Sequence, residues 1–331
     1  MNRISAFFPA AALFLSSVSF AQLTPSGNPA DFKVKPCLHS VSYAGFWRGQ
    51  ERLSVEEFLV KAKELEFEYV MLVAKRPHLS PHDYDDAARR KLRARIEELG
   101  LKLVCLAGYT DFTAGIDKPG IPNAEIQAAY VGEVARLARD LGADMLRIFT
   151  GYERPGVPWD NQYAQVVEGL KLAGRAAAKY GVTLAVQNHH DFALHHEAMK
   201  WLLDEVNLPN VRSAWDAWSP TLEGLTGEEL RESVLTLKPY IVHTTAADYI
   251  SLPRYRYEHE LINYIQQPAV MRAVPMGEGI IDYTAFFGAL KEIGYRGYIG
   301  YEMCAELEGG GSIANLDATA KKFLQYMKKF E

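Results

Sequence analysis

The stretch Val182-Thr-Leu-Ala-Val-Gln-Asn-His189 is a short apolar run that ends in polar side chains, and the chain repeats this arrangement. The repeats are Val211-Arg-Ser-Ala-Trp-Asp216, Ile241-Val-His243 and Tyr298-Ile-Gly-Tyr-Glu302. Short, almost continuous apolar runs are typical of parallel strands that are buried on both faces. In a (β/α)8 barrel, functional side chains stand at the carboxyl ends of the strands. The side chains that we expect at that end are Gln187, Asp216, His243 and Glu302.

Apolar runs alternate with helical patterns along the rest of the chain. Ser54, with Glu57 three residues later, forms a capping box that predicts a helix over 55–66, and Thr226 with Glu229 predicts another helix start. We therefore predict the α/β class and one TIM-barrel domain over 35–331. A doubly wound open sheet shows the same alternation, but no glycine-rich phosphate-binding turn follows the first strand.

The first 21 residues have the pattern of a secretory signal peptide. Met1-Asn-Arg is basic, residues 4–20 are almost wholly apolar, and Val18-Ser-Phe-Ala21 has small residues at the cleavage positions. We expect cleavage near Ala21, a polar N-terminal arm over 22–34, and a secreted, periplasmic protein. No later stretch reaches the roughly 18 apolar residues of a membrane span, so no membrane partner is expected.

Charge and cysteine content exclude some functions. The formal net charge of −5 argues against nucleic acid as a partner, since such proteins normally have a basic surface. The three cysteines are Cys37, Cys105 and Cys304. An odd number leaves at least one free thiol, and their positions in predicted strands favour buried, unreactive thiols.

Two carboxylates, one amide and one imidazole form a mostly hard set of metal ligands. This set suits a divalent metal, Mn²⁺ first, with Mg²⁺, Co²⁺ or Zn²⁺ as alternatives. Such an ion polarises a carbonyl while a neighbouring carboxylate or histidine removes the adjacent proton. Side chains two apart on a strand share a face, so we expect His189 beside Gln187 and Trp218 beside Asp216.

The end of the chain carries a family resemblance. The segments 276–282 (MGEGIID) and 290–302 (LKEIGYRGYIGYE) are similar to the last βα unit of the xylose-isomerase-like TIM-barrel superfamily. This is the sugar phosphate isomerase/epimerase or AP endonuclease 2-like family, and the resemblance covers nearly the whole mature chain. It implies a divalent metal held by Glu, Asp, His and Glu. These ligands fall on Gln187, Asp216, His243 and Glu302.

Gln187 departs from that pattern. Its amide oxygen can bind a metal, but the change removes one negative charge and the amide cannot act as a base. We therefore expect Glu302 as the catalytic carboxylate, with His189 or His190 as its partner. This favours one-base isomerisation or β-elimination over epimerisation by two facing carboxylates. Export favours an unphosphorylated sugar or glycoside, because sugar phosphates are mainly cytoplasmic.

The leading prediction is a metal-dependent sugar isomerase/epimerase-like enzyme. The alternatives are a 3-keto-glycoside lyase, a non-catalytic sugar-binding barrel, and a phosphodiester hydrolase, which would need more ligands and a basic surface. Predicted substrate-binding residues are His39, Lys75, His78, Tyr109, Trp218 and Glu278. Arg147 is either a buried ion-pair partner or a substrate clamp. The tyrosine-rich insertion over 247–276 predicts a lid or a contact in a homo-oligomer.

Overall fold

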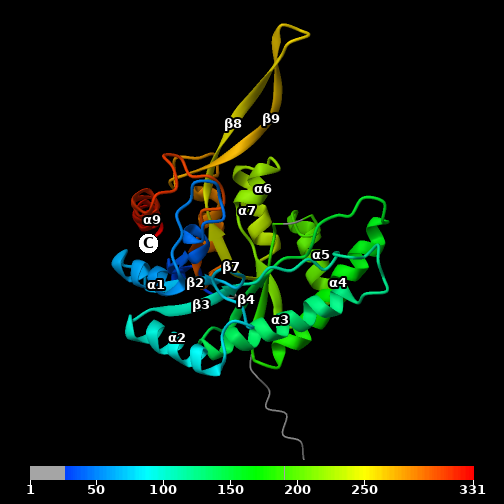
Figure 1. Cartoon of the computed structure of the whole chain (residues 1–331), viewed down its shortest axis with the longest axis vertical. Coiled ribbons are helices and arrows are strands. Elements are labelled where there is room, and N and C mark those ends of the chain that lie inside the picture. Colours follow the sequence, from blue (N-terminus) through cyan, green and yellow to red (C-terminus); the bar gives the residue numbers. More distant parts are fainter. Residues whose placement is uncertain (1–26, 190) are drawn as a thin grey trace, which may run out of the picture.

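The computed structural model describes residues 27–189 and 191–331. Within them, eight parallel strands close into one barrel, and the connecting helices pack around its outside (Figure 1). Neighbouring strands follow the chain order, and the last barrel strand pairs with the first. The predicted single-domain (β/α)8 barrel is therefore confirmed. The predicted signal peptide over 1–21 lies outside the described residues.

The barrel strands are short and most of their residues are buried. They are β1 (Pro36–His39), β2 (Tyr69–Val73), β3 (Lys102–Ala107), β4 (Met145–Ile148), β5 (Thr183–Gln187), β6 (Val211–Ala214), β7 (Ile241–Ala246) and β10 (Ile299–Tyr301). Helices cover one side of each strand and the barrel interior covers the other, which explains the nearly continuous apolar runs.

Each helix buries one apolar face against the barrel. The helices are α1 (Val55–Glu64), α2 (Asp86–Glu98), α3 (Asn123–Asp140), α4 (Trp159–Ala178), α5 (His196–Val206), α6 (Trp218–Leu222), α7 (Gly227–Thr236), α8 (Tyr283–Glu292) and α9 (Ile313–Met327). Both predicted capping boxes are present, at the starts of α1 and α7. In the described part of the N-terminal arm, a short 3₁₀ turn (Pro29–Asp31) precedes β1.

The barrel interior contains its own apolar layer, distinct from the larger core between strands and helices. Cys37 and Cys105 belong to this inner layer; both are free and buried. Burial raises the pKa of the Cys105 thiol to about 12, so it stays protonated and unreactive. Cys304 is also free but only half-buried.

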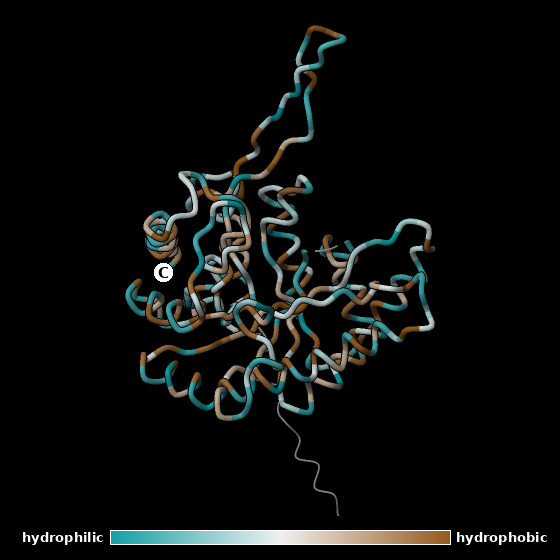
Figure 2. Tube along the Cα trace, viewed as in Figure 1, coloured by the Kyte–Doolittle hydropathy of each residue, from teal (hydrophilic) through white to brown (hydrophobic). Residues whose placement is uncertain are grey.

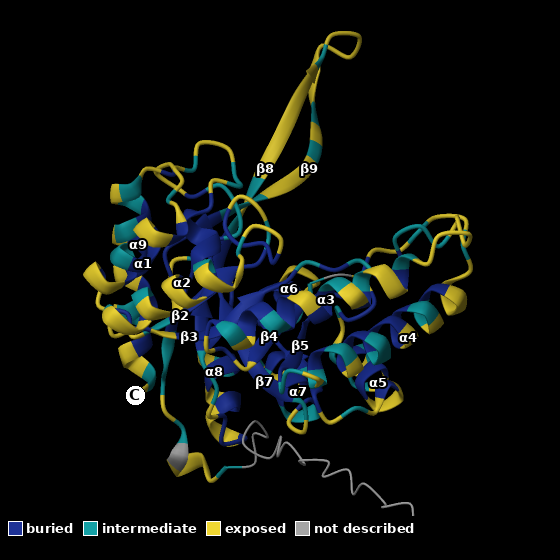
Figure 3. Cartoon of the chain, turned by 60° about the horizontal axis from the view of Figure 1, so that its bottom comes forward, coloured by how far each residue is buried: buried dark blue, intermediate teal, exposed yellow. Residues whose placement is uncertain are grey.

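The tyrosine-rich insertion forms a long antiparallel ribbon of β8 (Asp248–Glu258) and β9 (Asn263–Val274). It projects from the barrel, and most of it is exposed (Figures 1 and 3). Its tip includes hydrophobic residues between hydrophilic ones (Figure 2), and Ile262 is 79% exposed there. Across the described residues, no helix has the length and apolar character needed to cross a membrane.

Asp248 holds the base of this ribbon against the barrel. Its carboxylate accepts hydrogen bonds from the backbone N–H groups of Gly277 (2.9 Å) and Gly279 (3.0 Å). A Cβ on Gly279 would lie 2.0 Å from Asp248 Oδ1, so only glycine allows this approach. At the same end, the Tyr249 ring packs 5.5 Å from that of Trp218. The ribbon therefore begins close to the carboxyl ends of the strands.

Candidate active site

A cavity of about 360 Å³ opens where the strands end. Its polar lining consists of Lys75, Arg147, Gln187, His189 and Glu302. Its aromatic lining consists of Phe46, Trp47, Tyr109, Phe149 and Tyr152, with Val41 and Cys304 beside them. Most of these side chains follow the last residue of a strand, which is where barrel enzymes assemble their active sites.

Glu302, directly after β10, is a buried carboxylate on the cavity wall. Its Oε2 lies 2.9 Å from Nδ1 of the fully buried His39. Burial alone would raise the pKa of Glu302, but the His39 hydrogen bond and the Arg147 charge outweigh it and hold that pKa below its usual range. An ionised carboxylate only accepts hydrogen bonds, so His39 carries its proton on Nδ1.

Gln187, the last residue of β5, joins the two carboxylates. Its Nε2 lies 3.0 Å from Asp216 Oδ2, 3.2 Å from Glu302 Oε1 and 3.1 Å from Thr245 Oγ1. Its Oε1 is buried and has no hydrogen-bond partner among the described residues. The amide thus lies between two carboxylates that would otherwise repel each other.

Asp216 lies just after β6 and is fully buried behind the cavity wall. Its Oδ1 accepts a hydrogen bond from the backbone N–H of Ser219 (3.1 Å) in the first turn of α6. Burial raises the pKa of Asp216 to about 7, against the hydrogen bonds that stabilise its charge. This carboxylate therefore depends on its partners to remain ionised.

His243 lies deeper than its sequence position suggested. The strand was expected to end at His243, but β7 continues to Ala246, so this side chain is inside the barrel and fully buried. Neither ring nitrogen has a hydrogen-bond partner among the described residues. Burial lowers the pKa of His243 to about 3, so the imidazole is neutral and one nitrogen has a free lone pair.

With the Gln187 amide reversed, Gln187, Asp216 and Glu302 would together present three oxygens to a divalent ion. No three His, Cys, Asp or Glu side chains in the described ranges are grouped so as to hold a metal. However, rotation of the terminal amide by half a turn exchanges its oxygen and its nitrogen. Gln187 Nε2 lies 3.0 and 3.2 Å from the carboxylate oxygens, close to the spacing of adjacent ligands in an octahedral shell of roughly 2.1 Å radius. Reversal would also turn the unpaired Gln187 oxygen toward the two carboxylates.

His189 lines the cavity beside Gln187, on the expected face. Its ring lies 4.7 Å from the Trp218 ring and 5.2 Å from that of Phe149. Burial lowers the pKa of His189, so it is neutral and can accept a proton. Trp218 begins α6, does not continue a strand, and supports His189 from behind the wall. His190 lies outside the described residues.

The predicted substrate-binding residues occupy different environments. Lys75 and Tyr109 line the cavity, whereas His39 does not line it and is hydrogen-bonded to Glu302. Both ring nitrogens of His78 are engaged by protein groups, Ser40 Oγ at 3.2 Å and the Leu53 carbonyl at 3.0 Å. Glu278 is exposed and pairs with a surface lysine, Lys322, at 2.8 Å. The structure thus places His78 and Glu278 in supporting and surface positions, away from the cavity lining.

Several lining residues had not been anticipated from the sequence. Phe46 and Trp47 come from the connection between β1 and α1, and Tyr152 follows β4. The sequence feature that could have identified Phe46 and Trp47 is that two aromatic residues stand side by side shortly after the first strand. Arg147 lines the cavity and makes no ion pair with any described residue, which leaves the substrate-clamp alternative.

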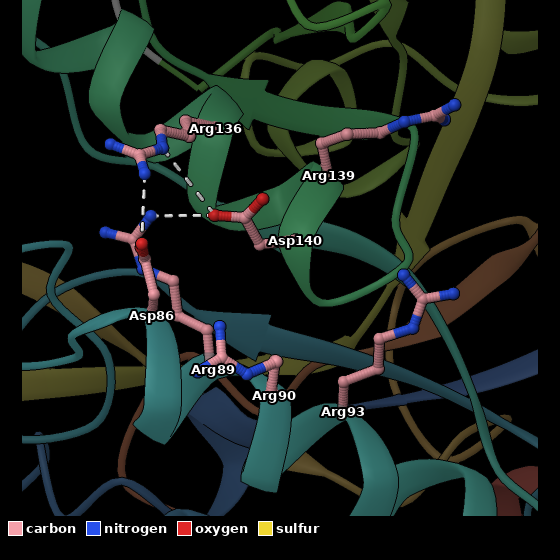
Figure 4. A pocket seen from close by; sticks show the side chains of 7 residues that line it. All are labelled: Asp86, Arg89, Arg90, Arg93, Arg136, Arg139 and Asp140. Atoms are coloured by element: carbon pink, nitrogen blue, oxygen red, sulfur yellow. Dashed lines mark hydrogen bonds and ion pairs between the residues drawn. The ribbon is translucent and has the colours of Figure 1, made fainter.

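A second hollow, of about 470 Å³, lies outside the barrel between α2 and α3 (Figure 4). Its lining is Asp86, Arg89, Arg90, Arg93, Arg136, Arg139 and Asp140. Arg89 pairs with Asp140 at 2.8 Å, and Arg136 with Asp86 at 3.1 Å. These ion pairs join the two helices. The strand-end cavity is therefore the candidate active site.

Comparisons with known proteins agree with this geometry. Two curated relatives are sugar epimerases by name. The putative L-ribulose-5-phosphate 3-epimerase SgbU of Escherichia coli (strain K12) is 28% identical, over 77% of this chain and 85% of the relative. L-ribulose-5-phosphate 3-epimerase UlaE of Salmonella heidelberg (strain SL476) is 25% identical, over 75% and 81%.

Solved structures with low sequence identity share the fold. D-psicose 3-epimerase from Clostridium cellulolyticum H10 superposes with a TM-score of 0.68 at 14% identity, covering 90% of this chain and 99% of that one. The apo 3-keto-D-glucoside 4-epimerase YcjR from E. coli gives 0.63 at 16% identity, covering 90% and 100%. The family model described as xylose isomerase-like TIM barrel matches residues 59–330. The chain belongs to this xylose isomerase-like TIM-barrel family.

Proposed function

We propose that this chain is an exported, divalent-metal-dependent sugar isomerase/epimerase-like enzyme. It would remove a proton beside the carbonyl of an unphosphorylated sugar. The observation that carries the proposal is the position of Glu302, an ionised carboxylate that lines an aromatic-walled cavity together with His189. A general base must lie within hydrogen-bond reach of the proton that it removes, and this wall is where a sugar would bind.

Gln187, Asp216, His243 and Glu302 are the residues that would hold the metal. When bound, a divalent ion supplies Lewis-acid polarisation of the substrate carbonyl, and Mn²⁺ is the ion that we propose, with Mg²⁺, Co²⁺ or Zn²⁺ as alternatives. His39 would orient Glu302 through the Nδ1–Oε2 hydrogen bond of 2.9 Å. The surrounding aromatic rings would exclude water and pack against the C–H faces of the sugar.

Gln187 shapes the choice of reaction. Among the described lining residues, Glu302 is the only carboxylate, so it would both remove the proton and return it, with neutral His189 as its partner. This supports one-base isomerisation over epimerisation by two facing carboxylates. The same single base also supports β-elimination of a 3-keto-glycoside, which we keep as the second candidate.

Solvent deuterium exchange tests the proposed chemistry. Purified protein with Mn²⁺ is incubated in D₂O with D-fructose, D-tagatose and a 3-keto-glucoside, and the products are followed by NMR. The proposal expects deuterium at the carbon next to the carbonyl, strongly reduced in Glu302→Gln and unchanged in the surface control Glu278→Gln. Release of the aglycone from the keto-glucoside would support the lyase. Sugar binding without exchange on any probe would indicate a non-catalytic barrel and overturn the proposal.

Metal binding and export have separate tests. Metal analysis of purified protein is expected to find a divalent ion in the wild type and much less in His243→Ala; equal contents would remove His243 from the proposed ligand set. The export proposal rests on residues 1–21. Cell fractionation and N-terminal sequencing are expected to find the protein in the periplasm, starting near Gln22. An intact Met1 in the cytoplasm would contradict it.

A further inference from the structure

We propose that the cavity selects a sugar that carries an anionic group, specifically a carboxylate, and that Lys75 and Arg147 bind this group. This inference rests on the proposed function, because it names the substrate class of the same cavity. The relevant observation is that two cationic side chains line the cavity, and neither makes an ion pair with a carboxylate of the described residues.

Arg147 is the deeper of the two cationic groups. It comes from β4 and is only 2% exposed. Its Nη1 donates to the Gly108 carbonyl at 3.1 Å, while its buried Nε has no hydrogen-bond partner among the described residues. Its guanidinium carbon lies 4.2 Å from the ring centre of Phe149 and 4.9 Å from that of Tyr109. The aromatic rings hold the guanidinium in place and leave donors for a ligand.

Lys75 lies beside Arg147, just after β2. Its Nζ is 3.9 Å from the centre of the same Tyr109 ring and 4.3 Å from that of Phe46. Both cationic groups thus contact the Tyr109 ring, which itself lines the cavity. Their repulsion is visible in the Lys75 ammonium, whose pKa is lowered by burial and, secondly, by the charge of Arg147. An added anion would offset this repulsion.

The barrel order separates these cations from the carboxylates. In the closed ring of eight strands, β4 is four steps from β10 in both directions, so Arg147 stands across the barrel from Glu302. By the same count, the β2 side, with Lys75, stands across from β6, which carries Asp216. Both oxygens of Glu302 are already engaged, by His39 and Gln187. Arg147 and the proposed base therefore line opposite sides of the cavity, with Lys75 two strands from each.

Buried charges without partners are costly, so proteins normally pair them. Arg89 shows the usual solution elsewhere in this chain, since it is buried and pairs with Asp140 (Figure 4). In the cavity, the ligand itself would supply the missing negative charge. Its carboxylate would face Lys75 and Arg147, while the reacting carbon faces Glu302.

A carboxylate suits this wall better than a phosphate. A carboxylate is planar and singly charged, and one guanidinium and one ammonium suffice to pair with it. Phosphate groups are usually also bound by backbone N–H groups at a helix N-terminus. None of the described lining residues lies in the first turn of an α-helix. The binding experiment includes a sugar phosphate to separate the two anions.

The test is equilibrium binding by calorimetry, on the metal-loaded protein. The probes are D-glucuronate and D-galacturonate, their methyl esters, D-glucose, and D-glucose 6-phosphate. At least one uronate is expected to bind about tenfold or more tightly than its own ester, the usual size of a charge-assisted contact. Lys75→Met and Arg147→Met are expected to remove this difference. Equal affinity for uronates and esters, or no uronate binding, would overturn the inference, as would a phosphate bound more tightly than either uronate.

Matched variants keep the result interpretable. Arg90→Met removes a cation from the outer hollow and is expected to leave uronate binding unchanged. Lys75→Arg keeps the charge and is expected to retain most of the preference. If Arg147→Met fails to fold, Lys75→Met carries the test. Binding can be measured without turnover. A preference for uronates without deuterium exchange would therefore contradict only the proposed reaction. Exchange on neutral sugars without uronate preference would sink only this inference.

Discussion

Gln187 places a neutral amide where Asp216 and Glu302 converge, and this residue decides how the site holds charge. Its two N–H donors stabilise the carboxylates in the absence of any cation. Reversing the amide presents an oxygen in the same place. The sequence indicated this convergence because each side chain closes a short apolar run. It did not reveal the depth of His243, because the end of β7 is determined by pairing with β10.

Gln187→Glu is expected to lower the stability of the metal-free protein and to raise its affinity for the metal. A third carboxylate would lose the N–H donors and add repulsion, lowering the free energy of unfolding without metal by about 1–3 kcal/mol. Added Mn²⁺ should then stabilise the variant more than the wild type, because bound ligand adds to folding stability. Thermal melts with and without Mn²⁺ measure both effects. Gln266→Glu, on the exposed ribbon, is the control for added charge; identical behaviour of the two variants would refute the expectation.

The lowered pKa of Lys75 predicts a pH dependence of anion binding. Only the ammonium attracts a carboxylate, so affinity for the preferred uronate should fall as pH rises through this pKa, below the roughly 10.4 of free lysine. For stability of the empty protein the sign is opposite, because the folded state loses this proton more easily than the unfolded state, so the cost disappears as pH rises. Calorimetry from pH 7 upward measures the binding effect. The same fall in Lys75→Arg would rule out titration of Lys75.

Among the helices and strands, the features that depend on neighbouring residues were the easiest to predict from the sequence. The capping boxes at Ser54 and Thr226 depend on residues three apart, so the sequence alone located both helix starts. The ribbon of β8 and β9 was recognised only as an insertion, since its exposed strands lack the apolar runs of the barrel. The short helix α6 was missed for a related reason: Trp218 follows a strand pattern but begins a helical turn.

Two glycine substitutions should have opposite effects on stability. Gly279→Ala would place a Cβ 2.0 Å from Asp248 Oδ1 and loosen the base of the ribbon, at a cost of about 1–3 kcal/mol. Gly288→Ala lies on the exposed face of α8 with nothing within 4 Å, and should stabilise the protein by about 0.5–1 kcal/mol. Urea unfolding measures both. Equal effects in the same direction would show that the Asp248 contact is unimportant.

At the scale of the whole molecule, the barrel and the ribbon differ in how they are supported. The barrel was predictable because eight buried strands leave a strong periodic pattern. The residues that line the cavity were harder to predict than the barrel. Phe46 and Trp47 reach the cavity through a loop, and the path of that loop depends on packing. Their side chains, together with Phe149 and Tyr152 after β4, form an aromatic lining that no single segment indicates.

We expect the ribbon to open far more often than the barrel. A two-stranded ribbon with little packing is marginally stable in water, whereas the barrel strands are held by both cores. Hydrogen exchange followed by mass spectrometry should show residues 254–267 exchanging well ahead of β3 to β7. Equal protection would mean that another surface covers the ribbon, as the predicted homo-oligomer contact would require.

The two opposite walls of the cavity also set a direction for whatever binds between them. A ligand attracted by Arg147 at one end and presented to Glu302 at the other has a single way of lying in the barrel. Only one of its carbon–hydrogen bonds, on one side of the ring, then faces the proton acceptor. The arrangement of the strands would therefore determine which carbon of the ligand reacts and which stereoisomer forms.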